Sequence, residues 1–190
     1  MTGVPDRIPF GPATITVGEG EDALKFDGKE YLQVEGGELT LTPSFTDETY
    51  VDFGETVVNR YLTGWEGTLT FAAGQENMKI FKLALSATKP ITDTTSSEEV
   101  GFTDAKIGTA LSDYARKVVI HPRSKPDNDK SSDITIYQMV ASGDFTKTYT
   151  NEQGSLSIEL SMIPRQGFDA SKDGNFFYFG PVDPNAVVTP

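Results

Sequence analysis

The alternation of apolar and polar residues changes abruptly within residues 65–85. Residues 65–73 alternate with a period of two, which is typical of a half-buried strand. The apolar face of that predicted strand consists of Trp65, Leu69, Phe71 and Ala73. Residues 75–86 instead carry a broad apolar stripe with polar residues opposite it, which predicts a short amphipathic helix. Since no other segment of similar length has so clear a helical pattern, we expect a β protein with one helix that follows directly on a strand.

Alternating or β-branched segments elsewhere predict further strands, separated in the N-terminal part by turns rich in glycine and acidic residues. The predicted strands are 13–17, 23–26, 31–34, 39–42, 114–121, 133–141, 155–163 and 175–179. Segment 144–149 is expected to extend one of them past a bulge. Segments 133–141 and 155–163 alternate most cleanly, and the inward positions of the second are Leu156, Ile158, Leu160 and Met162. These elements predict a mainly β fold, an antiparallel β-sandwich or barrel with one flanking α-helix and long loops.

Two long polar segments interrupt this pattern. Residues 42–64 have no sustained period and predict an extended loop or a projecting hairpin. Loops longer than about 12–15 residues are uncommon in compact domains and are often functional. The aromatic residues of this segment are Phe45, Tyr50, Phe53 and Tyr61. Such residues favour a partner surface over a flexible connection. The second segment, 88–109, has weak strand propensity and is expected to be a loop.

The length of 190 residues suits a single domain, and a 37% hydrophobic content is enough to form a core. We find no linker that would divide the chain and no internal repeat. The N-terminus, about residues 1–12, is rich in proline and polar residues and is expected to form an extended arm. Residues from about 180 to 190 are expected to form a C-terminal tail.

The net charge of −12 is concentrated in the first third of the chain. Residues 1–58 contain twelve acidic and three basic side chains. Such a surface repels phosphate and therefore disfavours sequence-specific or groove-tracking contacts with nucleic acid. Two interpretations remain open: a surface that serves solubility, or one that stays near a polyanion without binding it.

The absence of cysteine removes disulfides, thiolate chemistry and cysteine-based zinc sites, and is consistent with a cytoplasmic protein. The first residues lack the apolar stretch of a signal peptide, and no run of about 18 apolar residues occurs. We therefore expect a soluble protein that does not insert into a membrane.

Few residues offer chemistry. His121, the only histidine, precedes a proline at a strand end and is interpreted as structural. Residues 127–129 lack the glycine and distal glutamate of a calcium loop and are interpreted as a solvated turn. Adjacent carboxylates such as 47–48 and 98–99 are expected by chance among 28 acidic residues, and the glycine-rich acidic turns lack the lysine of a phosphate-binding loop. We expect no catalytic residue, no metal site, no cofactor and no enzyme activity.

The order of these elements resembles the major tail tube protein of long-tailed, siphovirus-like bacteriophages. In that family a β-sandwich or barrel carries one helix on its flank, a long loop or hairpin reaches neighbouring subunits, and extended arms bridge successive rings. Here residues 42–64 correspond to the long loop, 65–73 to the strand after it and 75–86 to the flanking helix. The later strands complete the sheet, whereas 88–109 has no counterpart that we can assign.

The resemblance implies a virion structural protein that self-assembles into stacked, hexameric rings. These rings would form the tail tube, an acidic conduit for DNA ejection. Its partners would be copies of itself and the tape measure, tail terminator and tail tip proteins, and genomic DNA would pass without specific binding. It would be made and assembled in the host bacterial cytoplasm and end in the virion tail. The implied assembly interface is Phe45, Tyr50, Phe53, Arg60 and Tyr61, and the candidate lumen-facing acids are Glu30, Glu35 and Glu38.

Three alternatives remain. A tail terminator or head–tail connector of related fold would form a single ring. A carbohydrate-binding β-sandwich would use exposed aromatic rings as a stacking platform, but Trp65, the only tryptophan, begins a core-patterned strand and is expected to be buried. A hydrolase ranks last because the sequence offers no nucleophile with its base.

Overall fold

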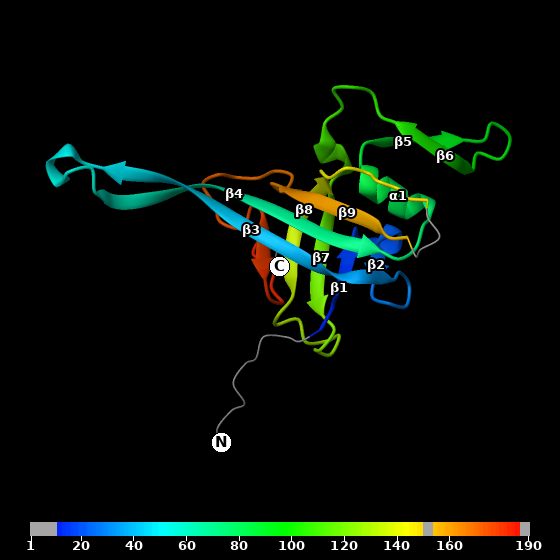
Figure 1. Cartoon of the computed structure of the whole chain (residues 1–190), viewed down its shortest axis with the longest axis horizontal. Helices are drawn as coiled ribbons and strands as arrows, with labels where there is room; N and C mark the ends of the chain where they lie inside the picture. Colours follow the sequence, from blue (N-terminus) through cyan, green and yellow to red (C-terminus); the bar gives the residue numbers. More distant parts are fainter. Residues whose placement is uncertain (1–10, 150–153, 187–190) are drawn as a thin grey trace, which may run out of the picture.

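The computed structural model describes residues 11–149 and 154–186 (Figure 1). Its main element is an eight-stranded antiparallel sheet with the order β2-β1-β7-β8-β9-β4-β3, in which β10 also pairs with β8. The strands are β1 (Ala13–Val17), β2 (Leu24–Phe26), β3 (Gln33–Thr49), β4 (Val57–Ala73), β7 (Arg116–Pro122), β8 (Ile134–Ala141), β9 (Leu156–Ile163) and β10 (Phe177–Phe179). The described part contains a single α-helix, α1 (Met78–Leu85), so the predicted mainly β, antiparallel fold with one flanking helix is confirmed.

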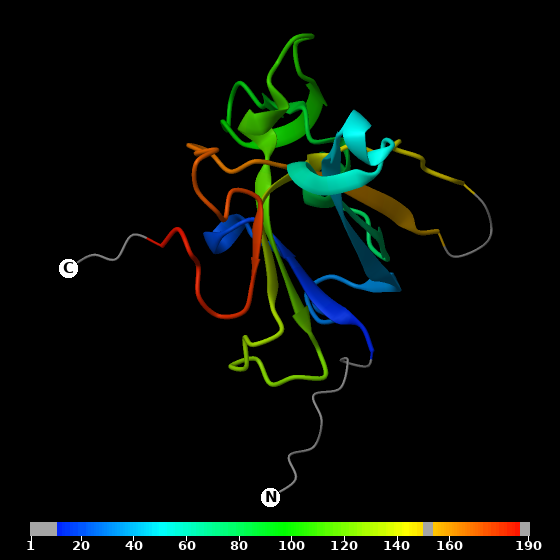
Figure 2. The same cartoon turned by 90° about the vertical axis from the view of Figure 1, so that its left-hand side faces the viewer.

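The sheet curls until its two ends meet, which makes it a partly closed barrel (Figure 2). The side-chain amide of Gln33 in β3 donates hydrogen bonds to the carbonyls of Ala13 and Phe26, at 2.9 and 2.6 Å. The rings of Phe26 in β2 and Phe71 in β4 meet edge to face, with centroids 4.8 Å apart. These contacts join strands from opposite ends of the order, and the hydrophobic core lies inside the curl.

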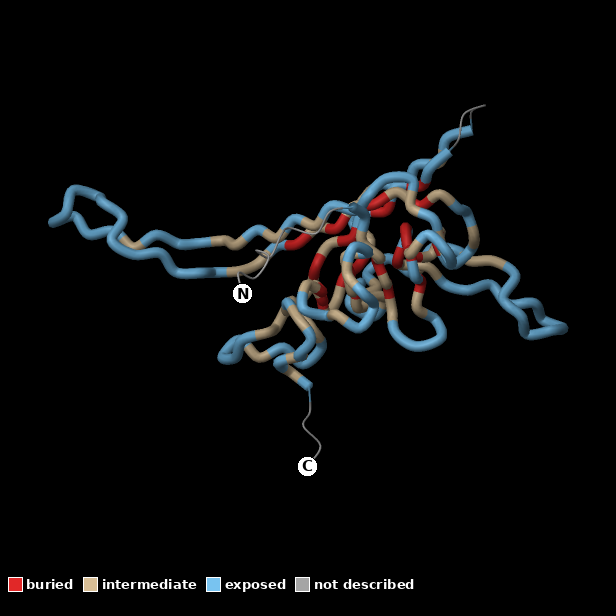
Figure 3. Tube along the Cα trace, turned by 90° about the horizontal axis from the view of Figure 1, so that it is seen from below, coloured by how far each residue is buried: buried red, intermediate tan, exposed pale blue. Residues whose placement is uncertain are grey.

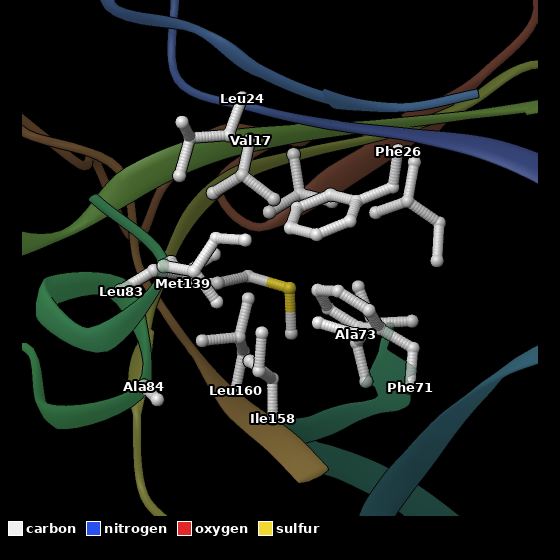
Figure 4. Packing of buried hydrophobic residues seen from close by; sticks show 14 of the residues in the cluster. Val17, Leu24, Phe26, Phe71, Ala73, Leu83, Ala84, Met139, Ile158 and Leu160 are labelled. Atoms are coloured by element: carbon white, nitrogen blue, oxygen red, sulfur yellow. The ribbon is translucent and has the colours of Figure 1, made fainter. Parts of the chain in front are cut away.

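Alternate residues of the strands fill this core, as a period of two requires. The inward face predicted for β9 is confirmed, because all four of its predicted inward residues are buried. Figure 4 shows the side chain of Met139 reaching into the middle of the cluster, near Ile158 and Leu160. Trp65 lies at the margin of the core and is only half-buried, with its ring edge-on to Phe177 at 5.1 Å.

The clean alternation predicted for 133–141 is wrong, because a bulge interrupts β8. Ile136 and Met139 are both buried in the core although they are three positions apart. The pairing with β7 shifts between these positions, where Arg116 and Val118 face Met139 and Ile136. Lys117 on β7 therefore lies opposite two residues of β8, Tyr137 and Gln138, and the extra residue turns Met139 inward.

The helix begins at Met78, three residues later than the pattern predicts. Asn77 caps it, because its side-chain oxygen accepts the backbone N–H of Ile80 at 2.9 Å. Ile80, Leu83 and Ala84 form the buried face, and α1 packs against β8 and β9.

Other predicted boundaries are corrected. Residues 88–109, expected to be a loop, contain β5 (Thr88–Thr92) and β6 (Glu99–Asp104). Among the strands that the structure describes, these two pair only with each other and therefore show no core-facing alternation. The predicted strands 31–34 and 39–42 are not separate: β3 contains the second half of the first and all of the second, and it is bulged between Glu35 and Glu38. Segment 144–149 is not a strand.

Short 3₁₀ turns, η1 (Gly20–Asp22), η2 (Val51–Phe53) and η3 (Leu111–Tyr114), complete the described elements. The described part of the predicted C-terminal tail is held on the sheet. The hydroxyl of Tyr137 donates to Asp183 at 2.6 Å and accepts from the side chain of Asn185 at 2.9 Å. Residues 1–10 of the predicted N-terminal arm, and 187–190, lie outside the described residues.

Candidate assembly interface

A long β-hairpin projects from one end of the sheet (Figures 1 and 3). Strand β9 pairs with β4 only from Thr68 to Ala73, whereas β3 and β4 stay paired with each other out to Thr49 and Val57. Residues 43–65, named here the arm, therefore form a two-stranded ribbon with η2 at its tip. The segment 42–64, predicted as an extended loop or projecting hairpin, is a hairpin.

The arm exposes an unusual number of large apolar side chains. They are Phe45, Tyr50, Val51, Phe53, Val57, Val58, Tyr61 and Leu62. The two at the tip are the most exposed, Val51 at 90% and Phe53 at 65%. An isolated two-stranded hairpin is marginally stable in water, and exposed apolar side chains gathered on one segment are typical of an interaction site.

The two faces of the arm differ in chemistry. On one face Phe45 lies opposite Leu62, and Asp47 lies opposite Arg60. The Arg60 Nε lies 2.8 Å from the Asp47 carboxylate, with the Nη2 at 3.4 Å from its second oxygen. Both side chains are exposed, so this pair adds little stability to the monomer.

The opposite face is built around Glu48. Its carboxylate accepts hydrogen bonds from the hydroxyls of Tyr50 and Tyr61, the latter at 2.9 Å. The hydrogen bond from Tyr50 is the main cause that lowers the pKa of Glu48, followed by that from Tyr61. The same bond raises the pKa of Tyr50. The carboxylate therefore orders two aromatic side chains along the arm.

The tip is a tight turn with a defined shape. Gly54 and Glu55 both have left-handed backbone angles, with φ of 65° and 62°. The rings of Tyr50 and Phe53 meet edge to face, with centroids 6.4 Å apart. This turn leaves Val51 and Phe53 exposed at the end of the arm.

All five residues predicted for the assembly interface lie on the arm, so the structure brings them together on one element. The sequence prediction missed Val51, Val57, Val58 and Leu62. Register shifts between Ser44 and Phe45 and between Glu48 and Thr49 remove the period of two from the arm, which hid these residues.

A second surface is the outward face where β3, β4 and β9 run side by side. Its cross-strand neighbours include Glu38 with Thr70, and Thr70 with Glu159. The outward positions are Glu35, Glu38, Thr40, Thr42, Glu66, Thr68, Thr70, Ala72, Ser157, Glu159 and Ser161. None of these positions holds a lysine or an arginine. The face is therefore acidic and rich in hydroxyl groups.

Of the three acids predicted to face the lumen, two lie on this outward face and one does not. Glu35 and Glu38 share this outward face although they are three positions apart, because the β3 bulge lies between them. Glu30 lies in the turn before β3, where its N–H donates to Asp27 at 2.9 Å, and it is not on the face. Glu66 and Glu159 were missed, because only the strand pairing places them on the same face as Glu38.

His121 is buried, with Nδ1 2.5 Å from the Asp133 carboxylate and Nε2 3.4 Å from the carbonyl of Lys125. Lys130 lies 3.5 Å from the same carboxylate. These contacts tie the 123–132 connection to the ends of β7 and β8, which is a structural role.

Within residues 11–149 and 154–186, no group of three or more histidine, aspartate or glutamate side chains is arranged to hold a metal ion. None of the helices described there has the length and apolar character needed to cross a bilayer. No family model matches the sequence, and a search among curated proteins finds no significant match. The function is therefore inferred from the surfaces described above and from the resemblance in element order.

Proposed function

We propose that this chain is a tail tube protein of a long-tailed bacteriophage. Its copies would form stacked, hexameric rings around a channel for DNA, closed by terminator and tip proteins and measured by a tape measure protein. The observation that carries the proposal is the arm, a 23-residue ribbon (43–65) with exposed apolar residues on a domain that otherwise buries its core. Such a ribbon gains stability only when a partner covers it.

A second copy is the partner that the arm itself favours. Every copy carries one arm that projects from one end of the molecule (Figure 1). A contact between the arm of one copy and the body of the next is heterologous, and heterologous contacts build rings or open stacks. A tube needs heterologous contacts that close each ring and further heterologous contacts that stack one ring on the next.

The sheet edge supports ring formation. Among the described residues β3 pairs only with β4, so no strand is hydrogen-bonded along the outer edge of its 17 residues. A long unpaired edge readily accepts another strand, and pairing around a ring would satisfy its backbone groups.

The outward face of β3, β4 and β9 supports a DNA channel. Glu35, Glu38, Glu66 and Glu159 point from it among hydroxyl groups, without a basic residue at any outward position. A surface of this kind repels phosphate and offers no contact that would hold DNA in transit. We propose this face as the lumen lining, with Glu66 and Glu159 added to the predicted acids.

Negative-stain electron microscopy of the purified chain at low and high protein concentration tests the proposal. Stacked rings or tubes with a central channel are the expected result. The matched variant replaces residues 46–61 with Asn-Gly, a two-residue turn joining Phe45 to Leu62, which are already paired. This variant should keep its circular dichroism spectrum and form no stacks.

The other outcomes separate the alternatives. Single rings that never stack would indicate a terminator or connector. Tubes formed equally well by the shortened variant would contradict the role of the arm. Dispersed monomers of the full chain at every concentration would contradict self-assembly without another component.

A further inference from the structure

We infer that the tip of the arm from one copy docks into a hollow beside α1 of the next copy. The inference rests on the proposed self-assembly and names the surface that receives the arm. The hollow has a volume of about 450 Å³ and is lined by Asp22, Met78, Lys79, Lys82, Glu99 and Arg116. Its residues come from η1, α1, β6 and the first position of β7.

The hollow differs in charge from the rest of the chain. Its three basic and two acidic residues leave it with one net positive charge, on a chain whose net charge is −12. Lys82 pairs with Glu99, whereas Lys79 and Arg116 form no salt bridge with any residue that the structure describes. Two cations are therefore available to carboxylates from outside the molecule.

The tip of the arm has the complementary chemistry. Between Tyr50 and Glu55 it carries two carboxylates, those of Asp52 and Glu55, and no basic residue. Neither carboxylate forms a salt bridge with a described residue. Val51 and Phe53 alternate with them and are exposed. The tip would thus bring an apolar side chain and two negative charges to its receptor.

The hollow beside α1 matches the tip of the arm in size and in chemistry. Met78 is exposed at the rim of the hollow and offers an apolar contact for Phe53. Asp52 and Glu55 would meet Arg116 and Lys79. The volume of the hollow falls in the range of ligand pockets, roughly 300–1,000 Å³.

The positions of tip and hollow make the contact intermolecular. The arm extends to one end of the long axis, whereas α1 and β6 lie toward the other end (Figure 1). The tip cannot reach the hollow of its own chain, so each copy gives one tip and receives another. This head-to-tail arrangement propagates, as a stack of rings requires.

Disulfide trapping tests the contact cleanly because the chain has no cysteine. Val51→Cys is mixed with an equal amount of Met78→Cys carrying a mass tag, oxidised, and separated on a non-reducing gel. The expected product is a mixed dimer, at least about tenfold more abundant than with the matched control, because docking raises the effective thiol concentration. The control pairs Val51→Cys with Thr95→Cys, an exposed position between β5 and β6.

Charge reversal provides a second readout. Arg116→Glu in the Met78→Cys partner should reduce the mixed dimer to the control level, and Asp52→Arg in the Val51→Cys partner should restore it. A mixed dimer no more abundant than the control would overturn this docking site. If the unmodified chain then still forms tubes under the microscope, the proposed function stands and only the receiving surface is wrong; if it forms none, both are wrong.

Discussion

Phe53 at the tip of the arm allows a quantitative prediction about self-assembly. The substitution Phe53→Ala removes a ring that is 65% exposed and that meets the ring of Tyr50 edge to face. Because the ring contributes no core packing, the free energy of unfolding should change by less than about 0.5 kcal/mol. The effect should appear in association alone.

The size of that effect follows from area. An aromatic side chain buries about 150–250 Å² when fully covered, so the exposed part of Phe53 is about 130 Å². At about 25 cal/mol per Å², full coverage in an assembly contributes about 3 kcal/mol, and half coverage about 1.5 kcal/mol. Since about 1.4 kcal/mol corresponds to a tenfold change, the protein concentration at which assembly begins should rise roughly ten- to hundredfold.

Sedimentation velocity over a concentration series measures the association, and urea unfolding followed by the fluorescence of Trp65 measures stability. Phe168→Ala is the matched control, because Phe168 is 59% exposed but lies in the connection between β9 and β10 and not on the arm. The reasoning is refuted if Phe53→Ala assembles at the wild-type concentration, or if Phe168→Ala weakens assembly as much.

Three further predictions concern the fold that carries these surfaces. Tyr137→Phe should lower the free energy of unfolding by about 1–2 kcal/mol at pH 8, because it removes the hydroxyl bonded to Asp183 and Asn185. Burial, and then the hydrogen bond to Asp183, raise the pKa of Tyr137 from 10.0 to about 12. Its ionisation-linked stabilisation is therefore complete below pH 10 and is lost as the pH rises through 12, so the urea midpoints of variant and wild type should converge over that window. Gly37→Ala would place a Cβ 2.7 Å from the buried Ile15 Cδ1. It should destabilise the chain by about 1–3 kcal/mol, and an unchanged thermal midpoint would refute the close approach of β3 to β1. Asn77→Ala removes the cap of α1 and should cost about 1 kcal/mol in urea unfolding, whereas Gln75→Ala, just before the helix, should cost less than half of that.

Local patterns predicted those elements whose side chains meet the core at a regular period. Strand β9 and the helix stripe are of this kind, because every second or every third to fourth residue meets the same apolar environment. The hairpin β5–β6 could not be predicted in this way, because its two strands pair with no other described strand and most of its residues face solvent. The bulge in β8 was hidden for a related reason: it appears only as a mismatch with β7, a partner distant in sequence.

The same distinction between local pattern and long-range pairing applies to the two candidate surfaces, the arm and the acidic face. Aromatic residues in an acidic, aperiodic segment were enough to indicate the arm and four of the five residues proposed for its contacts, the fifth being Arg60. The composition of that segment is a local property. The acidic face was only half predicted, because Glu66 and Glu159 join Glu38 through the pairing of three strands.

The sequence by itself determined the mainly β class, the single helix, the negative charge and the lack of thiol chemistry, because each depends on residue type or short-range period. Only the tertiary structure decided which carboxylates share a face, how far the hairpin projects beyond β9, and that its tip and the α1 hollow lie at opposite ends. Strand register and the closure of the curled sheet are set by contacts between residues far apart in the chain. No local pattern encodes them, since a shift of one residue in pairing would move every side chain to the other face.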